Sequence, residues 1–370
     1  MIRPRLLTGI DLPLEPSCGS TIWANDVYRQ LAPDFRTAFM AMPGSDTWPH
    51  GFEETIDLRA AKHPYGPRFA RYAEKLTDEV ERFVRIWRPH LIHAQHLGFG
   101  LALAFARAAG NTPLISIAHG TDIIAATEND QARDALTEVV TASTAVAVTN
   151  TAMADQVDAL TQGRFTERLI AIPWGIPLPE HPTAARLTDT RRLRLLHAGR
   201  LDANKSTATA IEAMALTADK HHLTIIGSGS ELPGLTAQAT NLDLAGQVRF
   251  EPFMTREALW QRFADFDAFL FTTKQLEAFG LVAVEAQAHG LPVVYGDLPG
   301  LRQTLGAGAL AYRPGDAAAL AACVDQLAED TDLRHDLGIA AAVSARRHDI
   351  RATATHLRDL SNTVLEVRRV

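Results

Sequence analysis

The sequence predicts an α/β protein made of two doubly wound domains, each a parallel sheet with helices on both faces. Three observations lead to this prediction. The chain has 370 residues, more than a single compact core usually holds. Short apolar runs alternate with longer segments of helical period along most of the chain. This alternation stops once, at a stretch rich in proline, threonine and charge, and then starts again.

The first half of the chain contains strand-like apolar runs separated by helical segments. Strands are predicted at RLLTGI (5–10), PHLIHAQ (89–95), PLISIAHG (113–120), TAVAVTN (144–150) and RLIAIPWG (168–175). Helices are predicted at STIWANDVYRQLA (20–32) and at GLALAFARAAG (100–110), where Gly110 ends the helix.

The second half repeats the pattern. Strands are predicted at LRLLHAGR (193–200), HLTIIGSG (222–229), QVRFEPF (247–253), FDAFLFTT (266–273), PVVYG (292–296) and ALAYRPGD (309–316). Helices are predicted at STATAIEAMAL (206–216), at REALWQRFA (256–264), from about Leu281, and through the C-terminal end of the chain.

The interruption, IPLPEHPTAARLTDTRR (176–192), has no apolar period and predicts a linker. We expect an N-terminal domain over 1–178, a linker over 179–190 and a C-terminal domain over 191–348. Terminal helices over 349–370 are expected to pack back toward the first domain. Two Rossmann-like domains joined in this way would face each other across a cleft, with their sites beyond the C-terminal ends of the strands.

Composition excludes several kinds of protein. The net charge of −7 argues against a broad nucleic-acid surface. The two cysteines, Cys18 and Cys323, lie far apart and offer neither a disulfide framework nor a zinc site, so we expect a cytoplasmic protein. Residues 1–16 lack the apolar core of a signal peptide, and no segment approaches the roughly 20 apolar residues that span a bilayer. We expect no metal and no resident cofactor; the sequence predicts no oligomeric state.

Two glutamates flank a small apolar run in LEAFGLVAVEAQAHGLPVV (276–294). A helix is expected to begin near Gly280, so that Glu277 precedes it and Glu285 lies within it. On one continuous helix, at about 100° per residue, the two would stand about 80° apart rather than on one face. The helix start offers N–H groups to an anion, and Gly280 lets a ligand approach the backbone. A carboxylate beside such a phosphate site suits sugar hydroxyls; the alternative is a loop glutamate and a solvated helix glutamate.

Two cations follow one strand in HAGRLDANKSTATAIEA (197–213). Arg200 is expected at the C-terminal end of the strand, and Lys205 just before the start of the next helix. A diphosphate carries two to three negative charges and needs donors of this kind. The alternative is two solvated surface cations.

Histidines end two strands of the first half. His119, in AHGTD, could donate to a sugar hydroxyl or tune a proton, or could be a satisfied buried histidine. His93 and His96 end a neighbouring strand and could shape an acceptor pocket. Gly19, followed by Ser20 and Thr21, opens the first helix and is either a tight loop for a ligand or an N-cap.

Three further patterns are weaker. IIGSGSELPG (225–234) resembles a dinucleotide fingerprint, but its third glycine is displaced to Gly234, so we expect only a strand-to-helix turn that includes Gly227. Two D-x-D pairs have a spacing that could hold a metal, but nothing near them completes a ligand shell. They are Asp265 with Asp267, and Asp330 with Asp332.

Together these residues resemble the family 4 glycosyltransferases of GT-B fold. The resemblance covers most of the chain and rests on HAGRLDANK, LTIIGSGSE, VRFEPF and, above all, LEAFGLVAVEAQAHGLPVV, which matches the E-x7-E element of that family. PHLIHAQ, AHGTD and IPWGI match its weaker N-terminal signals. The chain departs from the family pattern at Trp174, Ser206 and Gln303, where asparagine, glycine and glutamate are usual.

The resemblance implies a metal-independent transferase that retains the anomeric configuration. Arg200 and Lys205 would bind the diphosphate of a nucleotide sugar, Glu277 the sugar hydroxyls and Glu285 the ribose. His119 would lie beside the transferred sugar, which makes Glu277, His119, Arg200 and Lys205 the expected catalytic set. The expected donor contacts are Gly19, Gly199, Arg200, Lys205, Gly227, Phe253, Glu277, Ala278, Phe279, Gly280, Leu281 and Glu285. The expected acceptor contacts are Ser20, Thr21, His93, His96 and Asp122.

Several functions stay open at this point. A nucleotide-sugar epimerase or a sugar phosphorylase could use the same fold, and a non-catalytic sugar-nucleotide binding protein could keep the same residues. A glycosidase that used the two glutamates would leave Arg200 and Lys205 unexplained. We expect a UDP-sugar donor, with a GDP-sugar as the alternative, and a hexosyl unit such as glucose or N-acetylglucosamine.

The acceptor is expected to be a small molecule: a sugar, an aminocyclitol or a secondary metabolite. The alternative is a lipid-linked acceptor at a membrane. The segment AAKHPYGPRFARYAEK (60–75) interleaves basic and aromatic residues and, as an amphipathic helix, could contact anionic lipid. A solvated helix with a packed apolar edge fits the acidic net charge better.

Overall fold

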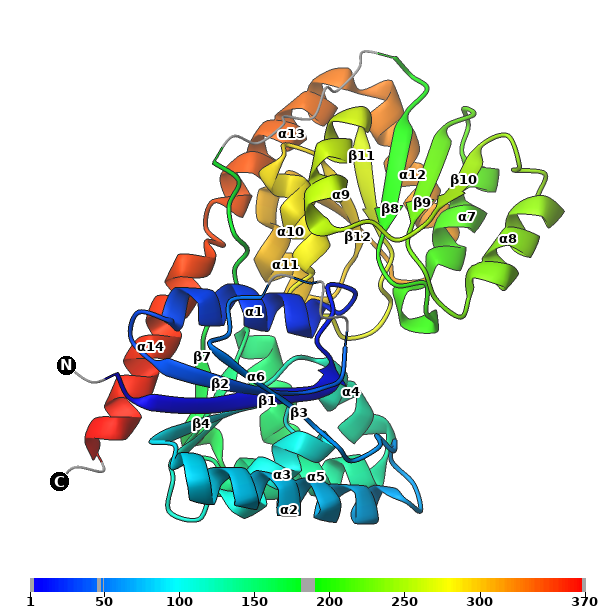
Figure 1. Cartoon of the computed structure of the whole chain (residues 1–370). Helices are drawn as coiled ribbons and strands as arrows, with labels where there is room; N and C mark the ends of the chain where they lie inside the picture. Colours follow the sequence, from blue (N-terminus) through cyan, green and yellow to red (C-terminus); the bar gives the residue numbers. More distant parts are fainter. Residues whose placement is uncertain (1–2, 45–47, 49, 181–189, 368–370) are drawn as a thin grey trace. The chain divides into compact units, whose positions relative to one another are not determined.

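The computed structural model describes residues 3–44, 48, 50–180 and 190–367. Its chain divides into two compact units (Figure 1). Unit 1 comprises Met1–Gly175 and Ile350–Val370, and unit 2 comprises Ile176–Asp349. Most of the predicted linker, 179–190, lies outside the described residues.

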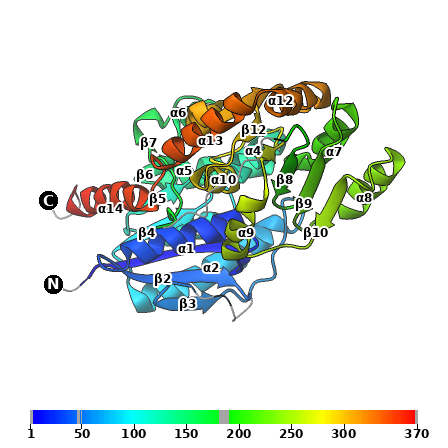
Figure 2. The same ribbon diagram turned by 90° about the horizontal axis from the view of Figure 1, so that it is seen from above.

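Unit 1 is built on a seven-stranded parallel sheet in the order β3-β2-β1-β4-β5-β6-β7. Its strands are β1 (Arg5–Pro13), β2 (Arg36–Met42), β3 (Glu54–Asp57), β4 (Leu91–Gln95), β5 (Leu114–Ile117), β6 (Ala145–Val148) and β7 (Leu169–Ala171). Its helices are α1 (Gly19–Leu31), α2 (Phe69–Trp87), α3 (Gly100–Ala108), α4 (Thr121–Glu128), α5 (Asp130–Ala142), α6 (Thr151–Leu160) and α14 (Ile350–Val367). Helices α1 and α14 lie on one face of the sheet, and α2, α3 and α5 lie on the other (Figure 1 and Figure 2).

Unit 2 is built on a six-stranded parallel sheet in the order β10-β9-β8-β11-β12-β13. Its strands are β8 (Arg194–Ala198), β9 (His222–Ile226), β10 (Val248–Glu251), β11 (Ala268–Phe271), β12 (Val293–Gly296) and β13 (Ala309–Tyr312). Its helices are α7 (Thr207–Leu216), α8 (Leu232–Asn241), α9 (Arg256–Arg262), α10 (Leu281–Ala288), α11 (Pro299–Leu305), α12 (Ala317–Glu329) and α13 (Thr331–Ala345). Helix α12 packs against α7, and α13 packs against α10.

The two sheets confirm the predicted class of two doubly wound α/β units. Every residue of β4, β5, β6, β11 and β12 is buried, and these strands are mostly apolar, although β4 also buries His93 and Gln95. Strand order reverses between β1 and β4 in unit 1, and between β8 and β11 in unit 2. Parallel sheets bind ligands beyond the carboxyl ends of the strands at such reversals.

The C-terminal helix α14 belongs to unit 1 although 174 residues of unit 2 separate it from the rest of that unit in sequence. It packs against α1, and its Ser361 hydroxyl lies 3.1 Å from the Nε2 atom of buried His93 on β4. Thr353 Oγ1 donates to the carbonyl of Pro173 at 2.9 Å. The last helix of the chain therefore completes one face of the first sheet.

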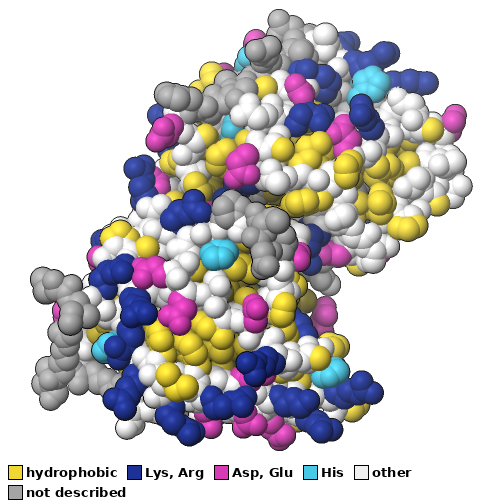
Figure 3. All heavy atoms as spheres, viewed as in Figure 1, with side chains coloured by type: hydrophobic (Ala, Val, Ile, Leu, Met, Phe, Trp, Pro, Cys, Tyr) yellow, Lys and Arg dark blue, Asp and Glu magenta, His cyan; other side chains and the backbone are white. Residues whose placement is uncertain are grey.

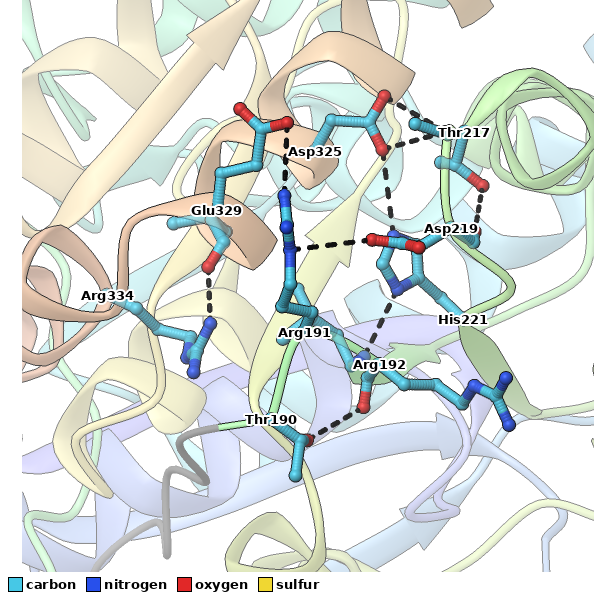
Figure 4. Close-up of polar contacts among 12 residues, drawn as sticks. Thr190, Arg191, Arg192, Thr217, Asp219, His221, Asp325, Glu329 and Arg334 are labelled. Atoms are coloured by element: carbon cyan, nitrogen blue, oxygen red, sulfur yellow. Dashed lines mark hydrogen bonds and ion pairs between the residues drawn. The ribbon is translucent and has the colours of Figure 1, made fainter.

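A polar cluster ties the amino-terminal edge of the unit 2 sheet to α12 (Figure 4). His221, just before β9, accepts a hydrogen bond at Nδ1 from the backbone N–H of Leu193, and its Nε2 atom lies 3.7 Å from Asp325 on α12. Arg191 lies 3.5 Å from Glu329 and 3.9 Å from Asp219. These contacts lie at the edge opposite the carboxyl ends of the strands.

The basic and aromatic segment at 60–75 is not one amphipathic helix. Helix α2 begins only at Phe69, and Phe69 and Tyr72 are buried in the core beneath the sheet. The Tyr65 hydroxyl donates to the carbonyl of Gly98. Figure 3 shows basic and acidic side chains interleaved along the lower edge of unit 1, where Figure 1 places α2. The aromatic residues therefore pack inward and are not displayed for lipid; within the described part of the chain, no helix is both long and apolar enough to cross a bilayer.

Candidate active site

Lys205 and Glu277 meet at the carboxyl end of the unit 2 sheet, where the strand order reverses between β8 and β11. Lys205 Nζ donates to Glu277 Oε2 at 2.6 Å, and the two side chains are 19% and 15% exposed. The Lys205 ammonium also lies 5.3 Å from the centre of the Phe271 ring at the end of β11. The alternative of two solvated surface cations is wrong for Lys205, which is largely buried and paired, and Glu277 is a loop glutamate whose carboxylate is also largely buried.

The loop after β8 is held by its own backbone and by the strand beside it. Residues Ala203–Lys205 form a short 3-10 turn whose N-cap, Asp202, accepts from the Lys205 N–H. Thr272 Oγ1 donates to the Lys205 carbonyl at 2.8 Å and so fastens this loop to the end of β11. Arg200 pairs with Asp202 at 3.3 Å, and its side chain is 55% exposed. Arg200 is thus at the predicted strand end, with its charge presented at the surface of unit 2.

The start of α10 has the geometry that the sequence predicted. Gly280 caps the helix with φ of 79°, a left-handed conformation that side-chain-bearing residues rarely adopt. A Cβ atom there would lie 3.0 Å from Leu301 and 3.2 Å from Phe271. The preceding Ala278 and Phe279 are buried, so the segment between the two glutamates packs inward, and the start of α10 leaves N–H groups without partners inside the helix.

Glu285 is buried within α10 and is not a solvated helix residue. Arg256, the first residue of α9, places its Nε atom 2.8 Å from Glu285 Oε1. Arg256 was not among the residues expected from the sequence. Its only signal was its place directly after Thr255, a typical N-cap residue, because a residue at that point of a crossover helix lies near the carboxyl end of the sheet.

The glycines of IIGSGSELPG have a packing role. A Cβ atom on Gly227 would lie 1.9 Å from the carbonyl oxygen of Gly199, and one on Gly229 would lie 2.2 Å from that of Leu201. These glycines let the turns after β8 and β9 pack directly together, which supports the strand-to-helix turn that we expected. Phe253, after β10, is 43% exposed and presents its ring at the same edge.

His119 lies in unit 1, after β5, in a stack of aromatic and imidazole rings. Its Nε2 atom is 2.8 Å from Gln95 Oε1 at the end of β4, and its ring centre is 4.3 Å from that of His96. His96 in turn stacks on Phe99 at 4.2 Å and has a positive φ of 67°. Burial lowers the pKa of His119 to about 3 and holds the pKa of His96 well below its usual range, so both imidazoles are neutral at pH 7.

The expected acceptor residues separate into two groups. Ser20, beside exposed Gly19 at the start of α1, has its hydroxyl 3.2 Å from His96 Nε2, so these residues cluster at the strand reversal of unit 1. Thr21 and His93, however, are buried and fully engaged. Thr21 donates to two backbone carbonyls, and the two ring nitrogens of His93 contact Tyr28 and Ser361. The expectation that Thr21 and His93 contact an acceptor has no support in their surroundings.

Asp122 is also a structural residue in this arrangement. Its carboxylate accepts hydrogen bonds from the backbone N–H groups of Leu97 and His119, and it is buried. It therefore fixes the ends of β4 and β5, which carry His96 and His119. Burial raises the pKa of Asp122, and the hydrogen bonds from backbone N–H groups oppose that rise.

Two features of unit 1 were not anticipated. Trp174, which departs from the family pattern, stacks on Trp23 of α1 with ring centres 4.3 Å apart, and His119 meets this pair edge-on. Asp11 at the end of β1 is buried, accepts from the Tyr72 hydroxyl at 3.0 Å and lies 3.8 Å from Lys62. Both features depend on contacts between segments far apart in sequence.

Three aspartates of the two D-x-D pairs form ion pairs or cap a helix. Asp267 is buried and bound by Arg194, and Asp265 pairs with Arg262 at 2.8 Å. Asp330 is the N-cap of α13. Among the described residues, no group of three or more His, Cys, Asp or Glu side chains has a metal-binding arrangement.

Each of the two units matches a known family of glycosyltransferases. Residues 23–175 match the family described as "Glycosyl transferase 4-like domain", and residues 184–343 match "Glycosyl transferases group 1". The chain belongs to the GT-B glycosyltransferases of family 4 type. These two matches fall one on each unit, and the candidate residues of unit 2 lie within the second match.

Among curated relatives, this glycosyltransferase is similar to "Glycogen synthase" from Mycobacterium tuberculosis, at 29% identity over 302 residues, which is 76% of this chain and 70% of the relative. It is also similar to "D-inositol 3-phosphate glycosyltransferase" from Streptomyces coelicolor, at 31% identity over 240 residues, covering 58% of this chain and 52% of the relative.

Solved structures share the fold. Sucrose-phosphate synthase from Thermosynechococcus elongatus superposes with a TM-score of 0.83 at 19% identity, covering 99% of this glycosyltransferase and 100% of that chain. Anabaena HepE in complex with UDP and glucose superposes with a TM-score of 0.80 at 18% identity, covering 98% and 100% of the two chains. At these identities the likeness extends to the fold alone.

Proposed function

We propose that this glycosyltransferase moves a hexosyl unit, such as glucose or N-acetylglucosamine, from a UDP-sugar to a hydroxyl of a small acceptor with retention of anomeric configuration and without a metal ion. The Lys205–Glu277 contact at the strand reversal of unit 2 carries the proposal. It places a cation for a phosphate and a carboxylate for sugar hydroxyls within one hydrogen bond of each other, which suits a ligand that joins a phosphate to a sugar.

The residues then have distinct tasks. Lys205 and Arg200 bind the diphosphate and stabilise the charge that grows on the leaving phosphate as the bond from sugar C1 to phosphate oxygen breaks. The acceptor oxygen forms the new bond to C1, and its proton passes to the leaving phosphate. Glu277 holds sugar hydroxyls, and Glu285 holds the ribose. The neutral imidazole of His119 suits a hydrogen bond to a sugar hydroxyl better than it suits a charge pair.

Two cations take the place of a metal in this proposal. Lys205 and Arg200 supply positive charge at the diphosphate, whereas Asp265 and Asp267 already have arginine partners. HepE, which shares the fold, is seen with UDP and glucose, and this supports a sugar nucleotide as donor. We further propose that the enzyme acts in the cytoplasm, in keeping with the free thiols Cys18 and Cys323.

A small acceptor is favoured over a lipid-linked one. The aromatic residues of 60–75 that could have entered a membrane instead pack into unit 1. The described surface of α2 alternates Arg71 and Lys75 with Glu74 and Asp78, which is the pattern of a solvated helix. The acceptor would then be a sugar, an aminocyclitol or a secondary metabolite.

The test is a thermal-shift and transfer panel of UDP-, GDP-, ADP- and TDP-sugars, each with EDTA and with magnesium. We expect stabilisation by UDP-sugars, equal activity in EDTA and magnesium, and an axial product linkage from an axial donor by NMR. Stabilisation by none of the donors would overturn the transferase assignment. A magnesium requirement would overturn metal independence, and an inverted product would overturn the retaining mechanism.

A further inference from the structure

Arg256 and Glu285 form a buried ion pair between α9 and α10. The Arg256 Nε atom lies 2.8 Å from Glu285 Oε1, and the two side chains are only 13% and 6% exposed. A carboxylate at this depth needs a charged partner to remain ionised. The Arg256 guanidinium therefore gives the buried Glu285 carboxylate a compensating positive charge.

The position of Arg256 is fixed by several contacts. Thr255 caps α9 and accepts from the backbone N–H of Ala258, which sets where the helix starts. One turn later, the Trp260 ring lies 5.9 Å from the Arg256 guanidinium carbon. Trp260 also lies 5.4 Å from the ring of His289, whose Nδ1 atom is 2.8 Å from the Glu285 carbonyl.

These contacts form a closed ring. It runs from Glu285 to Arg256, along α9 to Trp260, across to His289 and back along α10 to Glu285. Each member is held from two sides, so the guanidinium has little freedom to leave the carboxylate. A planar guanidinium fixed in this way also fixes the orientation of the carboxylate that it binds.

Resting on the proposed function, in which Glu285 accepts hydrogen bonds from the ribose, we infer that Arg256 is a positioning residue for ribose recognition. It acts through Glu285 and need not touch the donor. Its effect is to hold the carboxylate in position and orientation, so that the preference for an intact ribose depends on Arg256 as strongly as on Glu285 itself.

The test compares UDP with 2′,3′-dideoxy-UDP by calorimetry. Hydrogen bonds from hydroxyls to a carboxylate are strong enough that the wild-type protein should bind UDP about tenfold or more tighter than the dideoxy compound. Glu285→Gln and Arg256→Gln should each reduce this ratio to about threefold or less, with dideoxy-UDP binding changed by less than about threefold. In the double variant, the ratio of the affinities for UDP and dideoxy-UDP should fall no further than in either single variant, because the two residues act through one contact.

Two further variants separate positioning from general damage. Arg256→Lys keeps a positive charge with altered geometry and should retain an intermediate ratio. Arg262→Gln removes an arginine from the same helix, where it pairs with Glu251 and Asp265, and should leave the ratio unchanged. Thermal unfolding shows whether each variant is folded.

Every result has a consequence. A wild-type protein that binds no UDP overturns the proposed donor and this inference with it. Equal binding of UDP and dideoxy-UDP overturns the ribose role of Glu285, and with it the role of Arg256. Suppose that the affinity ratio falls in Glu285→Gln but stays at the wild-type value in folded Arg256→Gln and Arg256→Lys. The proposed function then stands, and the inference alone is overturned.

Discussion

Lys205 and Glu277 are 72 positions apart in sequence, yet their ammonium and carboxylate groups meet at 2.6 Å in unit 2. Each comes from the loop after one of two adjacent parallel strands, β8 and β11. The pair is largely buried and rests on Phe271, so neither charge is an ordinary surface group. A phosphate entering this site would compete with Glu277 for Lys205 and free the carboxylate for hydroxyl groups.

Removing either member of this pair should abolish sugar transfer. Lys205→Ala removes the cation proposed for the leaving phosphate, and Glu277→Ala removes the carboxylate proposed for the sugar, so kcat/KM should fall by about 10²-fold or more in each. The measurement is steady-state transfer from UDP-glucose, with circular dichroism to confirm folding.

Arg191→Ala is the matched control for these variants. It breaks an ion-pair cluster at the opposite edge of the same sheet (Figure 4) and should leave kcat/KM within about twofold. Full transfer activity in folded Lys205→Ala or Glu277→Ala would mean that the catalytic site lies elsewhere.

Two glycines of one motif should respond in opposite ways to alanine. Gly227→Ala would place a Cβ atom 1.9 Å from the Gly199 carbonyl oxygen, so the turns after β8 and β9 must move apart. We expect a loss of about 2 kcal/mol or more in the free energy of unfolding. Gly234 lies in α8, where an added Cβ atom would meet no atom within 4 Å, so Gly234→Ala should gain about 0.5–1 kcal/mol. Urea unfolding distinguishes them, and equal effects would contradict the packing argument.

His119 should affect catalysis without affecting nucleotide binding. If it lies beside the transferred sugar, His119→Ala should lower kcat by about 10²-fold while the Kd for UDP, which has no sugar to transfer, changes by less than about threefold. His93 on the neighbouring strand offers a matched histidine. Its ring nitrogens contact Tyr28 and Ser361, so His93→Gln should lower the melting temperature and spare kcat. The reverse pattern would exchange the roles of the two residues.

Acid should destabilise unit 2 through His197. Burial lowers the pKa of this histidine from 6.5 to about 4, and its ring nitrogens contact the Leu270 carbonyl and Thr207. Below pH 6.5 the unfolded chain binds a proton that the folded chain excludes. The free energy of unfolding is therefore not reduced by His197 above pH 6.5. As the pH falls, it decreases by about 1.4 kcal/mol per pH unit between about pH 6 and pH 4.

The check is the pH dependence of the free energy of unfolding in urea. His197→Gln should be less stable at pH 7, yet its stability should fall less steeply with acid by about 1.4 kcal/mol per pH unit. His222→Gln, the exposed neighbour at the start of β9, should keep the wild-type slope. An unchanged slope in His197→Gln would show that this histidine does not exclude the proton.

The fold class, most strand positions and the unit 2 residues at the strand ends could be predicted from the amino-acid order alone. Buried parallel strands are mostly apolar, and a strand end followed by Gly280 or by an N-capped turn is a local signal in the sequence. The places of Lys205, Glu277 and Glu285 on their loops and helix could therefore be predicted before any contact was known.

Which of these residues meet could be learned from the folded chain and not from the sequence. The Lys205–Glu277 contact, the pairing of Glu285 with Arg256, and the burial of His93 against Ser361 join segments between 29 and 268 positions apart, and the order of strands in a sheet leaves no periodic trace in sequence. The same holds for Thr21 and His93. Their positions in the sequence predicted contact with an acceptor, but their polar atoms form hydrogen bonds within unit 1. Spacing along a chain fixes where a side chain stands on its own element, whereas burial and pairing depend on the neighbour that the fold brings beside it.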